Sequence, residues 1–414
     1  MMSFAALSFA ARWLLRSVVV SSIGLSSIGA VACAVACAAA PPGPRSVEEG
    51  GGEPSVTAQG PNASAPLPGD GSAASDGGTA VPRPAPQDMT SAPAARQGSL
   101  VERGLARGDG SPADEALRRG DAAWRGERWE EALELFERAR SLAPQDPAPW
   151  VGIARARSRD AALVYGAAAG DASFEEVVVA LDRALALQSD FTLARFEKGR
   201  VLLALGRPLE AKALLESVVE DAPEDAEAQS CLGVALLASG DVARARERFE
   251  RAAQLEPDRA ERFGNLATTQ MMVGGVEDAV RSYRSAVRLD PNSAQYQNDL
   301  GVALLAGGDL EGAMQHLSRA VALEPRRATF LSNLAYAHLA AGRPEEALRI
   351  ARRATELDPK LGSAWINRGT AEARLGRLPA ARRALERALQ LDPTDPRARD
   401  GLAELDELEA SAAP

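Results

Sequence analysis

Four polar side chains recur at intervals of 34 residues in the second half of the chain: Asn265, Asp299, Asn333 and Asn367. Three of them are amides, which both donate and accept hydrogen bonds. Such a column can hydrogen-bond to other polar groups. Its chemistry is therefore that of binding rather than of bond making or breaking.

Residues that bind metals or act as nucleophiles are few. Only Cys231 lies outside the N-terminal region, so neither a disulfide framework nor a cysteine-based metal site is expected. His316 and His338 have no carboxylate or cysteine at ligand spacing. We interpret Cys231 as a small buried thiol, with redox coupling as the alternative. The sequence predicts no catalytic site, no metal and no cofactor.

The amino-acid composition and net charge indicate the kind of fold and the kind of partner to expect. The 414 residues are 46% apolar but only 4% aromatic, which favours Ala-rich helices over one large core. The formal net charge is −10, and no Lys/Arg run follows the pattern expected for phosphate binding. Nucleic acid is therefore not expected as a partner.

The elements that position the polar column form a repeat. An Ala-x-x-x-(Phe/Leu/Tyr)-x-x-Ala-(x)4-Pro pattern gives unit starts at 192, 226, 260, 294, 328 and 362. The eighth position of each unit is small, which lets two helices approach closely: Gly199, Gly233, Ala267, Gly301, Ala335 and Gly369. Glycines predict the turn between the helices of a unit: Gly206, Gly240, Gly308, Gly342 and Gly376. Prolines end the second helices: Pro223, Pro257, Pro291, Pro325, Pro359 and Pro393.

This pattern resembles the tetratricopeptide repeat over about residues 113 to 411. A further unit begins at 113, and an irregular one begins at 147, with an insertion near Ser158 to Gly170 and Ser189 in place of the closing proline. The resemblance implies an all-α fold, an α-solenoid of about eight helical hairpins. Arg397 to Leu408 is predicted to be a C-terminal capping helix that covers the last hairpin.

In this family the first helices line a groove, reached by the second, fifth, sixth and ninth positions of each unit. The polar column occupies the sixth position and resembles the asparagine ladder with which long arrays hold an extended peptide. Gln295, Asn298 and Tyr336 extend the same wall. Because Ala favours helix, replacing Asn265, Asn333 and Asn367 by Ala is expected to leave the fold nearly unchanged. The basic clamp that some relatives use for a C-terminal carboxylate is not expected, since Arg118 and Arg200 lie in separate units.

The N-terminus reads as an export signal. Arg12 and Arg16 precede an uncharged run from Ser17 to Ala40. Small residues stand directly before Cys33 and Cys37, which resembles a bacterial lipobox and implies acylation of one of these cysteines. The usual Leu three residues before the cysteine is replaced by Ala. Ordinary cleavage with soluble export, and a retained membrane anchor, remain the alternatives.

These patterns divide the chain into four parts. Residues 1–37 are the signal and lipobox-like segment, 38–112 a disordered linker rich in Pro, Gly, Ala and Ser, 113–395 the array, and 396–414 the capping helix and tail. We expect a lipid-anchored adaptor of the bacterial cell envelope, an outer-membrane lipoprotein facing the periplasm, that binds peptide segments of proteins in envelope assembly. Secreted or periplasmic and membrane-anchored locations are alternatives. Two other functions stay open: a non-catalytic subunit of a separate enzyme such as a glycosyltransferase, and a structural spacer or self-assembling solenoid.

Overall fold

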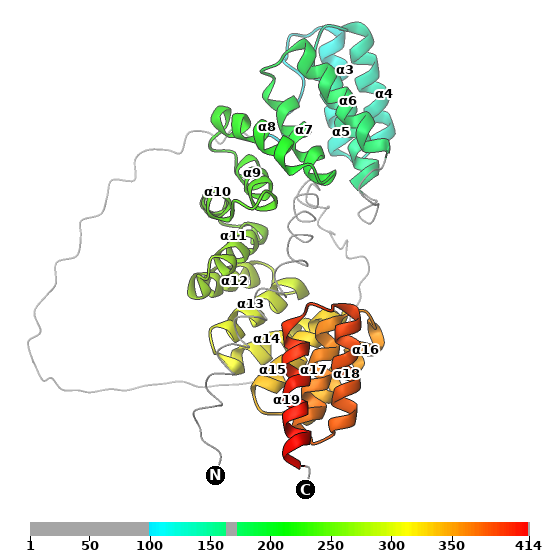
Figure 1. Ribbon diagram of the computed structural model, residues 1–414. Helices are drawn as coiled ribbons and strands as arrows, with labels where there is room; N and C mark the ends of the chain where they lie inside the picture. Colours follow the sequence, from blue (N-terminus) through cyan, green and yellow to red (C-terminus); the bar gives the residue numbers. More distant parts are fainter. Residues whose placement is uncertain (1–98, 163–171, 413–414) are drawn as a thin grey trace, which may run out of the picture. The chain divides into compact units, whose positions relative to one another are not determined.

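The computed structural model describes residues 99–162 and 172–412, which form seventeen helices and no strand (Figure 1). Successive helices pair into eight hairpins, and a last helix follows them. The pairs are α3 (Pro112–Arg125) with α4 (Trp129–Leu142), α5 (Ala148–Ala162) with α6 (Ala172–Leu187), α7 (Thr192–Ala204) with α8 (Pro208–Asp221), α9 (Ala226–Ala238) with α10 (Val242–Leu255), α11 (Ala260–Met272) with α12 (Val276–Leu289), α13 (Ala294–Ala306) with α14 (Leu310–Leu323), α15 (Ala328–Ala340) with α16 (Pro344–Leu357), and α17 (Gly362–Arg374) with α18 (Leu378–Leu391). The predicted all-α solenoid is confirmed.

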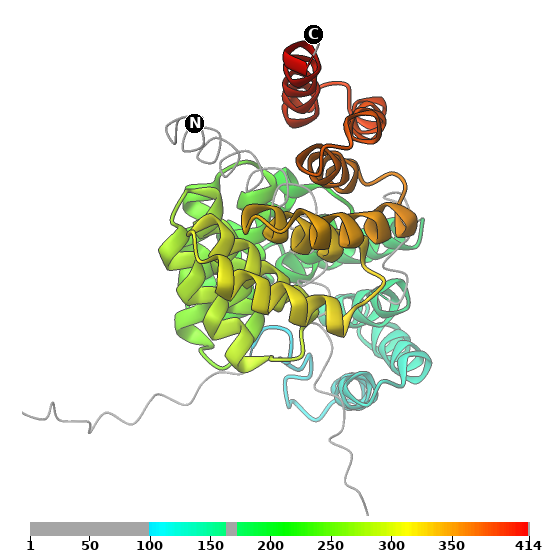
Figure 2. The ribbon, with the colours of Figure 1, turned by 90° about the horizontal axis from the view of Figure 1, so that it is seen from below.

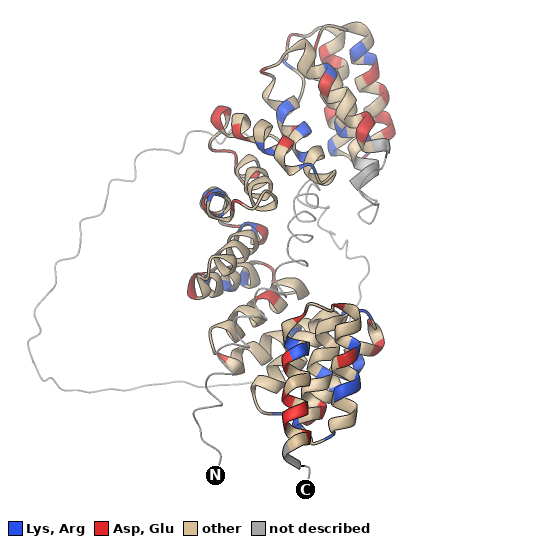
Figure 3. Cartoon of the chain, viewed as in Figure 1, with Lys and Arg blue, Asp and Glu red and all other residues tan. Residues whose placement is uncertain are grey.

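The two helices of a hairpin differ in composition because they differ in surroundings. First helices pack against their own second helix and against both neighbouring units. Nearly every residue of α9 is buried, and its one charged residue is Glu227. Second helices bury a narrower face, so α10 and α16 carry many charged residues of both signs, as Figure 3 shows along the ribbon.

Close approach within a hairpin depends on the small residue at the eighth position. A Cβ atom added at Gly233 would lie 2.8 Å from the ring of Phe249, and one at Gly301 would lie 2.6 Å from Leu317. The large side chain of the second helix therefore fills the space that the glycine leaves. The predicted role of the eighth position is confirmed by these distances.

The turns inside the hairpins need a left-handed backbone. The five glycines predicted there have φ between 70° and 85°, and Gly274, not singled out from the sequence, has φ of 81° in the same place. In the first hairpin the corresponding residue is Glu127, with φ of 58°. A residue with a Cβ is strained in this region, so this turn is less favourable than the later ones.

The irregular unit and the end of the array complete the described chain. The insertion was predicted near Ser158 to Gly170; residues up to Ala162 belong to α5, and residues 163–171, between α5 and α6, lie outside the described residues. The capping helix α19 (Pro396–Ala412) follows α18 at the C-terminal end of the array (Figure 2) and packs against α18 and α17. It buries Ala398 and Leu405. Within the described ranges, no helix combines the length and the apolar character needed to span a membrane.

Residues 99–111, counted with the linker in the sequence analysis, lie against the first units. Leu100 is fully buried and Leu105 is 3% exposed, and both belong to the apolar core of the first half of the array. Residues Gly108 to Gly110, which connect this stretch to α3, are exposed.

Candidate functional site

The sixth-position column lies on four first helices. Asn265 belongs to α11, Asp299 to α13, Asn333 to α15 and Asn367 to α17. Asn265 and Asn367 are buried, and the other two are partly buried. The column therefore sits where neighbouring units meet, and its members Asp299 and Asn333 are partly open to solvent.

Four of the predicted side chains form one hydrogen-bonded chain. Gln295 Nε2 and Asn298 Nδ2 donate to Asp299 Oδ1 over 2.8 and 3.1 Å. Asn333 Nδ2 donates to Asn298 Oδ1 over 2.9 Å, from the next unit. The sequence analysis placed these residues on one wall, and the structure brings them into contact.

Asp299 is the ionisable member of this chain. Burial raises the pKa of its carboxyl to about 6, although the bonds from Gln295 and Asn298 and the charge of Arg327 act in the opposite direction. Hydrogen bonds from two amides stabilise the charged carboxylate less than the water that burial removes would stabilise it. The column thus contains a carboxyl that keeps its proton to a higher pH than an ordinary aspartate does.

Asn367 repeats the contact made by Asn333. Its Nδ2 donates to the main-chain oxygen and to the Oγ of Ser332, over 2.8 and 3.1 Å. In both cases a sixth-position amide reaches the fifth position of the preceding unit, 35 residues earlier. Replacing Asn333 or Asn367 therefore removes an inter-unit contact, so the expectation of an unchanged fold needs correction for these two.

Asn265 differs from the other amides of the column. Its side chain makes no hydrogen bond to another residue within the described ranges, although the residue is only 6% exposed. Tyr336 is partly buried, and burial raises the pKa of its hydroxyl. It packs against the apolar core around α13 to α16 rather than joining the hydrogen-bonded chain.

Two arginines considered for a carboxylate clamp have separate roles. Arg118 is exposed and pairs with Glu115 on its own helix, at 2.6 Å. Arg200 is largely buried and pairs with Glu197, at 3.0 Å. The structure gives them different partners, as their separate units predicted.

Cys231 is buried, and the two histidines, His316 and His338, are partly buried. Cys231 is fully buried, and burial together with Glu227 raises the pKa of its thiol, which disfavours the reactive thiolate. His316 Nδ1 lies 2.8 Å from Gln297 Oε1, and burial lowers the pKa of both His316 and His338. In residues 99–162 and 172–412, no group of three His, Cys, Asp or Glu residues could hold a metal ion.

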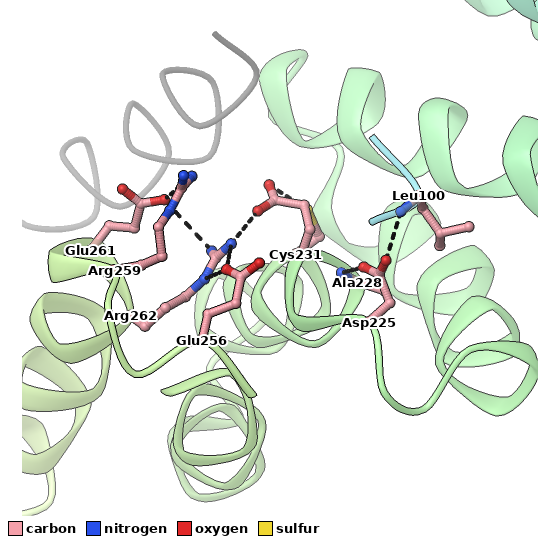
Figure 4. A network of polar contacts seen from close by, with 9 residues as sticks. Leu100, Asp225, Ala228, Cys231, Glu256, Arg259, Glu261 and Arg262 are labelled. Carbon is pink, nitrogen blue, oxygen red and sulfur yellow. Dashed lines mark hydrogen bonds and ion pairs between the residues drawn. The ribbon is translucent and has the colours of Figure 1, made fainter. Parts of the chain in front are cut away.

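A buried ion cluster joins the units at 226 and 260 (Figure 4). Arg262 Nη2 donates to Glu227 Oε2 over 2.6 Å, and its Nε donates to Glu256 Oε2 over 2.9 Å. Burial alone would lower the pKa of Arg262, but the two carboxylates raise it above its ordinary value. The guanidinium therefore stays charged, and losing either carboxylate would leave it poorly compensated.

A second set of groove residues binds a segment of the chain itself, residues 99–107, called here the N-terminal segment. Arg155 donates from Nη2 to the main-chain oxygen of Leu100 and from Nη1 to that of Arg103, both over 2.9 Å. Asp225 Oδ2 accepts from the Leu100 N–H at 2.7 Å, as Figure 4 shows, and Asp121 Oδ2 accepts from the Leu105 N–H at 2.6 Å. Side chains from three units thus hold the main chain of one segment.

This set was not predicted from the sequence. Asp121 and Arg155 both occupy the ninth position of their units, a place assigned to the groove, and that register was the available signal. Arg155 is 3% exposed, and its Nε also donates to Glu197 Oε1 at 2.6 Å. Burial raises the pKa of Asp121 even though it accepts main-chain hydrogen bonds.

The paired helices and the inward polar positions define a helical-repeat protein. A family model described as a tetratricopeptide repeat matches residues 99–148, 196–260, 265–328 and 332–396, more than half of the chain. The chain therefore belongs to the tetratricopeptide repeat family. Most of the irregular second unit falls outside the matched residues. No curated protein matches the chain.

Several solved structures are similar to this chain at low sequence identity. The hetero-tetramer Cut9–Hcn1 of the APC/C superposes with a TM-score of 0.50 at 16% identity, covering 71% of this chain and 56% of that chain. PilW, a type IV pilus biogenesis factor, gives 0.46 at 17% identity, covering 51% of this chain and 98% of its own. YrrB, a repeat protein with an unusual peptide-binding site, gives 0.40 at 19% identity, covering 45% of this chain and 96% of its own. The chain thus spans little more than half of the Cut9–Hcn1 chain, and the similarity to that chain concerns the fold alone.

Proposed function

We propose that this chain is a non-catalytic protein-binding scaffold whose first helices hold extended peptide segments of partner proteins. The supporting observation is the polar wall on α13 and α15, where Asp299 and Asn333 of the column form one hydrogen-bonded chain with Gln295 and Asn298. Such a chain fixes the side chains before a ligand arrives, so less conformational freedom is lost on binding.

The location proposed for this scaffold is a bacterial cell envelope. The support is the export signal with small residues before Cys33 and Cys37, one of which would carry acyl chains. Both cysteines lie outside the described residues. Intact mass spectrometry of the native protein tests this part. An acylated chain that begins at Cys33 or Cys37 is expected, and an unmodified chain that begins later would contradict it.

Asn265 gives the sharpest test of peptide binding. It is the column amide without a hydrogen bond inside the described structure, so Asn265→Ala removes no inter-unit hydrogen bond. Loss of one amide contact to a bound main chain costs about 1 to 3 kcal/mol, which weakens binding about 5- to 150-fold.

Random peptides displayed on phage provide the probe. Peptides enriched by the wild-type chain are synthesised, and their affinities are measured for wild type, Asn265→Ala and the control Asn292→Ala. Asn292 is an exposed amide in the turn before α13 that accepts a hydrogen bond from Arg319 over 3.2 Å, and its replacement is expected to leave the peptide affinity unchanged. Equal affinities for wild type and Asn265→Ala would contradict recognition by the column.

A further inference from the structure

The N-terminal segment is bound in the way a groove binds a ligand. Three units supply the side chains, and their hydrogen bonds go to main-chain groups of Leu100, Arg103 and Leu105. The partners lie 16 to 125 residues away along the chain, so these are tertiary contacts and not local turns. Leu100 and Leu105 supply the apolar anchors.

We propose that the first three units form a second peptide-binding site, that the chain's own residues 99–107 are its resident ligand, and that a partner segment with two leucines five residues apart displaces them. This site is separate from the sixth-position column on α11 to α17. The inference rests on the proposed peptide-binding role of the groove. It adds a second site, which residues 99–107 of the same chain occupy.

The contacts define what a competing segment must contain. Asp225, Arg155 and Asp121 bind main-chain groups of the segment. Val101 and Ala106 pack against the apolar core beside the two leucines, and Arg107 pairs with Asp146 at 2.6 Å. A Cβ added at Gly104 would lie 3.0 Å from Asp121 Oδ2 and 3.2 Å from Arg125 Nη2, which favours a small residue there. A partner therefore needs two leucines at this spacing and is favoured by a small residue directly before the second one.

The same contacts favour replacement of the N-terminal segment by another strand over its release without replacement. Arg155 is buried against Glu197 and stacks 5.4 Å from the ring centroid of Trp124. Departure of the segment would remove two carbonyl acceptors from this buried guanidinium, which is costly. A competing strand restores those acceptors, so replacement is easier than simple release.

The connection to α3 permits the segment to move as a unit. Gly108 and Gly110 have φ of 79° and 73°, are exposed, and have no atom within 4 Å of an added Cβ. Rotation at these two glycines can therefore change the path of the chain, at the cost of the hydrogen bonds that the N–H groups of Arg107 and Gly108 donate to Asp114 of α3.

A labelled peptide tests the proposal in the full chain. Leu100→Asp combined with Leu105→Asp removes both anchors, and the probe is a fluorescein-labelled peptide with the sequence of residues 99–107, followed by fluorescence anisotropy. The double variant is expected to bind the peptide at least about 100-fold more tightly than wild type, whose own segment competes at high effective concentration.

Matched controls separate site opening from general damage. Leu209→Asp, at a leucine that is 72% exposed on α8, should behave like wild type. A peptide with both leucines changed to Asp should not bind. Equal binding to wild type and the double variant, or no binding by a double variant with wild-type circular dichroism, would overturn the proposal.

A second experiment tests the proposal if the Leu100→Asp, Leu105→Asp variant does not fold. A specific protease site replaces residues 108–110, the natively folded chain is cleaved there, and excess labelled peptide is added. Exchange of the label into the array, seen as co-elution on gel filtration, is the expected result, and no exchange would overturn the proposal. Asn265→Ala should leave this affinity within about twofold, so the outcome is independent of the test of the column.

Discussion

Replacing Asp299 by Asn probes the electrostatics of the column directly. Burial raises the pKa of this carboxyl to about 6, from an ordinary value of 3.8. The folded chain therefore binds the proton more tightly than the unfolded chain does. The contribution of this protonated carboxyl to the free energy of unfolding is fully present below about pH 4 and is lost as the pH rises through about 6.

The magnitude follows from the two pKa values. Their difference of about two pH units, at about 1.4 kcal/mol each, gives about 3 kcal/mol. Asn cannot ionise, and its Oδ1 can still accept the hydrogen bonds from Gln295 and Asn298. We expect Asp299→Asn to match wild type near pH 4 and to exceed its stability by up to about 3 kcal/mol at pH 7.

Hydrogen exchange of α13 peptides, followed by mass spectrometry, is the appropriate assay. Repeat arrays open locally, so exchange in α13 reports the relevant free energy better than a global unfolding curve. Comparing the two chains at each pH cancels the intrinsic exchange rate. Asp258→Asn, at an exposed position, controls for the loss of one negative charge. A difference between Asp299→Asn and wild type that stays constant from pH 4 to pH 7 would refute the reasoning.

Three further predictions concern the backbone, the packing and the N-terminal region. Glu127→Gly should stabilise the chain by about 1 kcal/mol, because a glycine adopts φ of 58° without strain; an unchanged or lower melting temperature would argue against strain in that turn. Gly233→Ala should cost about 1 to 3 kcal/mol in urea unfolding, since its Cβ would lie 2.8 Å from an aromatic ring, whereas Gly362→Ala, with no atom within 4 Å, should not destabilise. Deleting residues 41–98 should leave the melting temperature unchanged, while deleting 41–107 should lower it, because the longer deletion removes two buried leucines.

Much of the fold was determined by local sequence. The 34-residue period, the small eighth position and the turn glycines each act within one hairpin, so their consequences can be read from one unit. Gly274 and Glu127 are two turn residues whose left-handed conformation was not predicted from the sequence. Gly274 was not singled out although it makes the same turn, and Glu127 takes the left-handed conformation without being a glycine.

The polar column was partly determined by the sequence. Its spacing placed Gln295, Asn298, Asp299 and Asn333 on one wall, and the structure joins them. The spacing did not reveal that sixth-position amides reach back 35 residues to the preceding unit. That contact depends on how two hairpins stack, which the sequence of one hairpin does not specify.

The N-terminal segment was decided by tertiary structure alone. Its residues precede the first 34-residue unit, and its hydrogen-bond partners Asp121, Arg155 and Asp225 are distributed over three units. Each of these side chains, read by itself, is an ordinary charged residue on or beside a helix. They become a main-chain binding site because stacking brings them to one surface, where burial makes an unmatched charge costly and the segment's amide and carbonyl groups satisfy it.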